Sequence, residues 1–192
     1  MADLDPRRTA LVLIDLQNGI LGMPTAPRGG PEVLAAGRTL AQRCRAAGVP
    51  VVLVRVAFAP DFADAPRQPV DQPMARPDGG LPAGWSDLPD GLAEPGDILV
   101  TKRQWGAFYG TDLDLQLRRR GVDTIVLGGV ATNIGVESTA RQAWELGYAV
   151  VLAEDVCASL SAEMHDWTLR HIFPRIARIR AGADIAFAPG AR

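Results

Sequence analysis

The chain has 192 residues, of which 47% are hydrophobic and 22% charged, and its formal net charge is −2. This length favours a single domain over residues 1–192, with a core that needs no disulfides. The near-neutral charge gives no reason to expect nucleic acid or an anionic membrane as a partner. No apolar run approaches the ~20 residues of a membrane span. Because the first residues are polar and only two cysteines are present, we expect a cytoplasmic protein.

Short apolar runs alternate with helical patterns along the whole chain. Continuous apolar runs predict strands that are buried on both faces, and periodic stretches bounded by Pro, Thr or Gly predict helices. The alternation favours a Rossmann-like, three-layer α/β/α fold with a doubly wound, mainly parallel sheet of about six strands. The expected strands cover residues 10–15, 49–56, 98–101, 124–127, 149–153 and 177–181, and the expected helices cover residues 31–47, 111–120, 134–146 and 161–173.

A proline-rich segment at about residues 58–97 interrupts this alternation. Eight of the 15 prolines lie between Pro60 and Pro95. A segment of this length with little regular structure is usually a functional loop or an interface segment, and the alternative is a solvated surface excursion. The segment also supplies apolar Phe62, Met74 and Trp85.

Three of the expected strands end in residues that could form a site. The first strand ends at Asp15, the third is followed by Lys102, and the fourth runs into small residues before a helix. Open α/β sheets bind ligands beyond the carboxyl ends of their strands, so these groups are expected to share one crevice. Each signal alone is weak, because Asp15 and Lys102 could simply neutralise one another.

The sequences at these strand ends carry a family resemblance. They read TALVLIDLQN at residues 9–18, TKRQWGAFYGTDL at residues 101–113 and GGVATNIGVESTAR at residues 128–141. In this order they resemble the isochorismatase-like (cysteine hydrolase) superfamily, whose members are hydrolases. The resemblance implies that Asp15 is a catalytic acid or base and Lys102 a catalytic lysine. The family's nucleophilic cysteine corresponds to Gly135, which carries no side chain.

The resemblance implies further features of the site. The peptide joining Val130 to Ala131 is expected to be cis and to present the Ala131 N–H, beside that of Gly135, as an oxyanion hole. Gln17 and Trp105 are expected to line the substrate pocket. Family members that bind zinc use histidine after the second strand, and residues 56–61 contain none, so no metal or other cofactor is expected. The family commonly forms dimers or tetramers, which predicts a homodimer or homotetramer.

Gly135 closes the covalent acyl-enzyme route and leaves three hypotheses. The first is a hydrolase that acts on a small carboxylate-bearing molecule, with Asp15 protonating a vinyl ether as in isochorismatases, which cleave without covalent catalysis. The second is a non-catalytic binding or scaffolding protein. The third is hydrolysis of an amide or ester by water that Asp15 activates. A sealed pocket lined by Gln17, Trp105 and the backbone at residue 135 favours chemistry, whereas a pocket filled by side chains favours binding.

Overall fold

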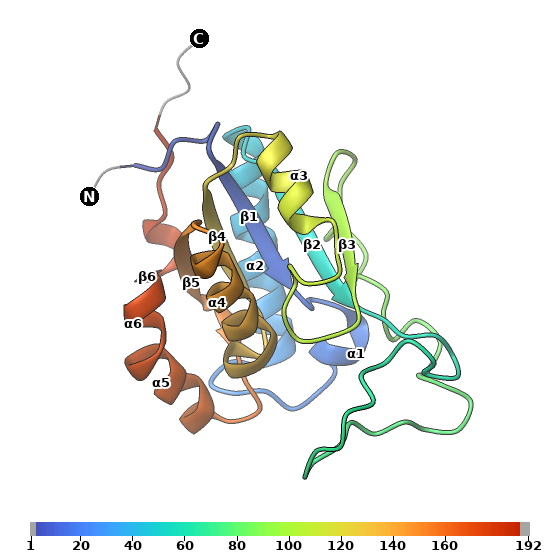
Figure 1. The fold of residues 1–192 in the computed structure, drawn as a ribbon. Helices are drawn as coiled ribbons and strands as arrows, with labels where there is room; N and C mark the ends of the chain where they lie inside the picture. Colours follow the sequence, from blue (N-terminus) through green and yellow to red (C-terminus); the bar gives the residue numbers. More distant parts are fainter. Residues whose placement is uncertain (1–2, 189–192) are drawn as a thin grey trace.

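A computed structural model describes residues 3–188 of the chain. It contains one six-stranded parallel sheet with the strand order β3-β2-β1-β4-β5-β6. This order confirms the doubly wound α/β fold, and the chain changes direction across the sheet between β1 and β4 (Figure 1). The strands are β1 (Thr9–Ile14), β2 (Val51–Val56), β3 (Ile98–Lys102), β4 (Thr124–Val130), β5 (Ala149–Ala158) and β6 (Arg178–Arg180).

The helices cover both faces of the sheet, with α2 on one face and α3 and α4 on the other (Figure 1). Two features were not expected from the sequence: the single turn α1 directly after β1, and a π-helical turn, η1, before α4. The final expected helix is divided into α5 and α6. The helical segments are α1 (Asn18–Leu21), α2 (Gly30–Ala46), α3 (Leu113–Arg119), η1 (Thr132–Val136), α4 (Glu137–Glu145), α5 (Ala162–His171), α6 (Phe173–Ile176) and the 3₁₀ turn η2 (Gly182–Asp184).

The central strand β1 shows why the sheet needs both helical layers. All six of its residues are buried. Ala10, Val12 and Ile14 pack with the α3 and α4 layer, whereas Leu11 and Leu13 pack with α2. Such a strand stabilises the fold on both faces, because each buried aliphatic side chain contributes about 1.5–3 kcal/mol.

Strands β4 and β5 are longer than their apolar runs predicted. Their pairing shifts register between Leu127 and Gly129, after which Gly129 pairs with Cys157. Cys157 was expected beyond the strand and instead lies within β5, fully buried. Gly129 has φ +133°, and a Cβ at this position would stand 2.1 Å from the carbonyl oxygen of Ile14. Only glycine therefore allows β4 to approach the end of β1 so closely.

The proline-rich segment joins β2 to β3 without a helix or strand of its own in residues 58–97. It extends away from the carboxyl edge of the sheet, drawn in teal and green in Figure 1. Trp85 anchors its return: the Gly19 N–H donates to the Trp85 carbonyl at 2.9 Å, and the indole occupies the space beside Gly19. Within residues 3–188, no helix has the length and apolar character needed to cross a bilayer.

Candidate active site

Asp15 stands at the topological switch point of the sheet. It follows β1 directly, and β1 lies beside β4, which leads into η1. Asp15 has φ +54°, in the left-handed region that residues other than glycine seldom adopt, although aspartate is among those that tolerate it. This conformation turns the chain out of β1, and its N–H still donates to the Val54 carbonyl at 2.8 Å.

Lys102, at the end of β3, forms a buried ion pair with Asp15. Its Nζ lies 2.8 Å from Asp15 Oδ2 and also donates to the Gln104 carbonyl at 3.1 Å. Only 2% of the Lys102 side chain and 7% of the Asp15 side chain are exposed. The structure therefore brings together the two charged groups that the sequence placed at separate strand ends.

The second carboxylate oxygen of Asp15 is the unusual atom of the site. Oδ1 is buried and has no hydrogen-bond partner among the described residues. Burial raises the pKa of Asp15 from 3.8 to about 6, and the Lys102 ammonium opposes part of this increase. A buried polar atom without a partner is costly in a native structure and often marks a functional group.

The turn after β4 brings Ala131 and Gly135 to the same cavity. The peptide between Val130 and Ala131 is cis, as the family resemblance implied, and it leads directly into η1. Thr139 fixes the turn from α4, because its hydroxyl donates to the Gly135 carbonyl at 2.7 Å and accepts from the Ala107 N–H at 3.1 Å. The turn is thus tied to the loop that carries Trp105. Single π-helical turns of this kind are frequent at functional sites.

Gly135 faces Asp15 without a side chain between them. A Cβ at this position would stand 3.2 Å from Asp15 Oδ2, 3.1 Å from Ile14 Cγ2 and 3.4 Å from the Trp105 carbonyl oxygen. Position 135 is therefore a direct neighbour of the carboxylate, and the space between them is narrow.

A cavity of about 650 Å³ opens above these groups. Its volume falls in the range of small-molecule sites, ~300–1,000 Å³. It is lined by Asp15, Ile20, Met23, Thr25, Val56, Phe58, Pro66, Gln68, Val70, Gln72, Pro73, Met74, Arg76, Trp85, Lys102, Arg103, Gln104, Trp105, Val130, Ala131, Ile134, Gly135 and Leu160.

The expected site residues do not all have the same relation to this cavity. Asp15, Lys102, Val130, Ala131 and Gly135 line it together. Trp105 lines it as well and is 65% exposed.

Gln17 has a different environment and is not among the lining residues. It is fully buried, and its amide accepts from the Val56 N–H at 2.8 Å and donates to the Val56 and Trp85 carbonyls at 3.0 and 3.3 Å. These bonds tie the segment after β1 to the end of β2 and to the proline-rich segment.

Part of the cavity wall could not be identified from strand ends. Phe58, Met74 and Arg76 come from the proline-rich segment, and Leu160 comes from the segment between β5 and α5. The one sequence signal for Phe58, Met74 and Arg76 was the length and proline content of residues 58–97, which predicted a functional loop without naming its contact residues.

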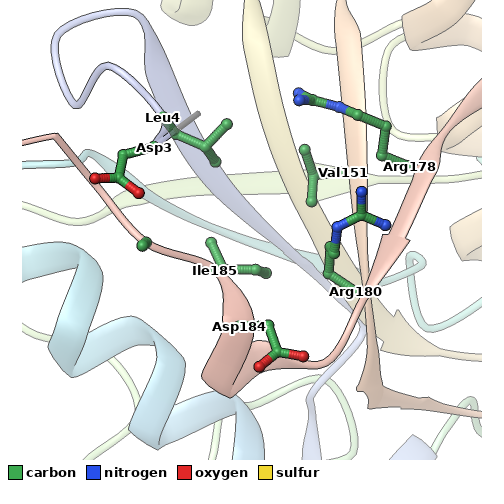
Figure 2. Close-up of a pocket in the computed structure, with 8 residues that line it drawn as sticks. Asp3, Leu4, Val151, Arg178, Arg180, Asp184 and Ile185 are labelled. Carbon is green, nitrogen blue, oxygen red and sulfur yellow. The ribbon is translucent and has the colours of Figure 1, made fainter. Parts of the chain in front are cut away.

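A second hollow lies beside β6 (Figure 2). Its lining includes Arg178, Arg180 and Asp184, and its volume is about 50 Å³. This volume is too small for an organic substrate. Within residues 3–188, no three His, Cys, Asp or Glu side chains are grouped so that they could hold a metal ion.

Known proteins with this arrangement identify the family. The isochorismatase domain family matches residues 9–184. The chain belongs to the isochorismatase family. It is 55% identical to the isochorismatase family protein YecD of Escherichia coli O157:H7 over 186 residues, which cover 96% of this chain and 98% of that protein.

An enzyme and a solved structure extend the comparison. Ureidoacrylate amidohydrolase RutB of Methylobacterium radiotolerans is 33% identical over 192 aligned residues, covering 88% of this chain and 74% of RutB. An isochorismatase family protein from Burkholderia thailandensis superposes with a TM-score of 0.90 at 45% identity, covering 95% of each chain. The protein is therefore an isochorismatase-family hydrolase.

Proposed function

We propose that this isochorismatase-family protein hydrolyses an amide or ester bond in a small carboxylate-bearing molecule, with water activated by Asp15. The observation that carries the proposal is the buried carboxylate of Asp15, which lines a cavity of about 650 Å³. Its Oδ2 lies beside Gly135 and is paired with Lys102, whereas its Oδ1 has no hydrogen-bond partner among the described residues. A site that had lost its chemistry would have no need to keep such a group desolvated.

The charge of the cavity wall supports an anionic substrate. Its cationic residues are Lys102, Arg76 and Arg103, whereas Asp15 is its one carboxylate among the described lining residues. Lys102 is paired with Asp15, and Arg103 is paired with Asp64. Among the described lining residues, Arg76 is therefore the one cationic side chain without an ion pair, and it supplies the excess positive charge. Guanidinium groups bind carboxylates with matched geometry, and the apolar side chains of the wall suit the body of a small organic acid.

The protonation state of Asp15 favours a base over an acid. With a pKa of about 6, roughly nine-tenths of the group is ionised at pH 7, which is the form that accepts a proton. A general base is most effective when its pKa lies near the working pH. Lys102 donates a hydrogen bond to Oδ2 of Asp15, and its positive charge lowers the pKa that burial raises, which favours the ionised carboxylate.

The reaction follows from these positions. A water molecule in the cavity gives a proton to Asp15, and its oxygen attacks the substrate carbonyl carbon. The carbonyl electron pair moves onto oxygen, where the N–H groups of Ala131 and Gly135 stabilise the negative charge. The tetrahedral intermediate then collapses, the bond to the leaving nitrogen or oxygen breaks, and protonated Asp15 returns the proton to that atom.

A second candidate is vinyl-ether cleavage, which the raised pKa of Asp15 also favours. Here protonated Asp15 would donate to the terminal vinyl carbon, and water would capture the resulting oxocarbenium ion. The two reactions make opposite demands on the same carboxyl group, so they are separable by experiment.

A substrate panel in isotopic water tests both reactions. The panel contains ureido acids, N-acyl amino acids, short esters of hydroxy acids and enolpyruvyl ethers, and mass spectrometry follows the products. Amide or ester hydrolysis in H₂¹⁸O places one ¹⁸O in the new carboxylate. Vinyl-ether cleavage in D₂O places one deuterium on the new methyl carbon.

The matched control is Asp15→Asn, prepared in the same way, which should lose turnover of the accepted substrate. If no panel member is turned over, and the wild type and Asp15→Asn bind these acids equally well, the result would support a non-catalytic binding protein instead.

A further inference from the structure

A buried contact between two segments joins the η1 turn to a helix that does not line the cavity. Thr132, the first residue of η1, is fully buried, and its Oγ1 lies 2.8 Å from Nδ1 of His165. His165 lies in α5 and is 3% exposed. The two residues are 33 positions apart in sequence, so this bond is a tertiary link.

The position of Thr132 within the turn gives this link its importance. Thr132 directly follows Ala131, whose carbonyl accepts from the N–H groups of Ile134 and Val136 at 3.1 and 3.2 Å. Any rotation of Thr132 therefore moves both the Ala131 peptide and the start of η1. Displacements of about 1 Å in a site can lower a rate by ~100-fold.

We propose that His165 is a positioning residue, which holds Thr132 and thereby aims the N–H groups of Ala131 and Gly135 at the reacting oxygen. This inference rests on the proposed function, because that function assigns the two N–H groups to the oxyanion. His165 itself does not line the cavity and acts through Thr132.

The chemistry of the pair suits a fixed contact. Burial, together with the nearby Arg28, lowers the pKa of His165, while Asp166 on the same helix opposes that decrease. A neutral imidazole has one donor and one acceptor nitrogen, and a hydroxyl can serve either one. The bond therefore forms with either tautomer of His165, and the neutral imidazole places no charge next to the η1 turn.

Side-chain geometry provides a selective rescue experiment. The amide of asparagine reaches the position of Nδ1 in histidine, whereas the longer side chain of glutamine reaches the position of Nε2. His165→Asn should therefore retain the bond to Thr132, and His165→Gln should lose it. Thr132→Val removes the hydroxyl at nearly constant volume and breaks the same bond from the other side.

A separate variant controls for the stability of α5. The Ser161 hydroxyl caps this helix by accepting from the Met164 N–H at 3.2 Å. Ser161→Ala should lower the melting temperature by weakening the cap while leaving the Thr132 bond in place. It is the matched control, because it weakens the same helix without changing the contact under test.

Two measurements test the proposal. On the substrate found with the panel, Thr132→Val and His165→Gln should lower kcat by about tenfold or more with KM within about twofold, as expected when a contact to the transition state is misaligned. His165→Asn and Ser161→Ala should stay within about threefold of the wild-type kcat. The second measurement needs no substrate: the ¹⁵N–¹H resonance of Gly135 should shift in Thr132→Val and His165→Gln and not in Ser161→Ala.

The outcomes separate this inference from the proposed function. A Gly135 resonance that stays in place in both Thr132→Val and His165→Gln overturns the positioning role, whether or not hydrolysis is found. Equal rescue by Gln and Asn, or a kcat loss in Ser161→Ala that matches its loss of stability, also overturns it. If the panel shows no turnover but the resonance shifts selectively, the coupling stands and the hydrolytic assignment fails.

Discussion

The pH dependence of the rate is the sharpest test of the role of Asp15. If ionised Asp15 is the base, kcat/KM should follow its ionised fraction, which is roughly one-tenth at pH 5 and nine-tenths at pH 7 for a pKa of about 6. The rate constant should therefore rise about tenfold between these two values and level off above pH 7. Initial rates on an accepted substrate, at concentrations far below KM and at constant ionic strength, give this profile directly.

The same experiment, repeated at two temperatures, tells whether the rise in rate between pH 5 and pH 7 reports the ionisation of Asp15. A carboxyl group ionises with almost no enthalpy, whereas an imidazole ionises with a large one, so the midpoint should barely move between two temperatures. A midpoint that moves strongly with temperature would assign the pH dependence to an imidazole instead of Asp15. A profile that falls from pH 5 to pH 7 would identify Asp15 as an acid and favour vinyl-ether cleavage. A flat profile over this range would refute the reasoning altogether.

Three substitutions extend the test to the surrounding residues. Lys102→Met removes the ammonium that favours ionised Asp15, so kcat/KM should fall at pH 7 and the midpoint of the pH profile should move upward; an unchanged midpoint would contradict the pairing. Gly135→Cys should create one thiol that iodoacetamide labels, as peptide mapping would show, because burial raises the pKa of both native cysteines to about 12 and they should stay unlabelled. Gln17→Leu leaves buried backbone groups unpaired and should lower the free energy of unfolding by about 2–3 kcal/mol in urea titrations; lost activity at unchanged stability would instead return Gln17 to substrate binding.

The strand ends were predictable because a parallel sheet leaves little freedom there. A continuous apolar run fixes where a strand lies, and the next polar residue must then emerge at the carboxyl edge. Asp15 and Lys102 follow this rule, and the order of the strands brings them within 2.8 Å of each other. The length of β5 was harder to predict, because Glu154 and Asp155 interrupt its apolar pattern although the strand continues to Ala158.

The walls of the cavity depend on tertiary contacts that sequence periodicity does not encode. Gln17 follows Asp15 by two positions and looks like a ligand-binding residue, but the carbonyls of Val56 and Trp85 are close enough to take its amide. The contact between Thr132 and His165 was equally invisible, because it links segments that no local pattern relates. Arg76 lies in a segment whose path is set by its prolines and by its anchor at Trp85.

The site also has a cost that links stability to function. The pKa of Asp15 is raised in the folded state, so between pH 3.8 and about 6 the native protein binds a proton that the unfolded chain has released. Stability from this group must therefore fall as pH rises through that window, by about 3 kcal/mol for a shift of about two units. Other carboxylates, such as Asp5, Asp64 and Asp123, have lowered pKa values and change stability with pH in the opposite direction. The contribution of Asp15 is therefore visible only when the stability of the wild type is compared with that of Asp15→Asn. Urea titrations of the wild type and Asp15→Asn from pH 4 to pH 7 should show Asp15→Asn gaining stability relative to the wild type. The proposed activity rises over the same pH interval. A group that raises the rate while it lowers the stability of the fold is one that serves chemistry. If the difference in unfolding free energy between the wild type and Asp15→Asn stays constant from pH 4 to pH 7, this argument fails.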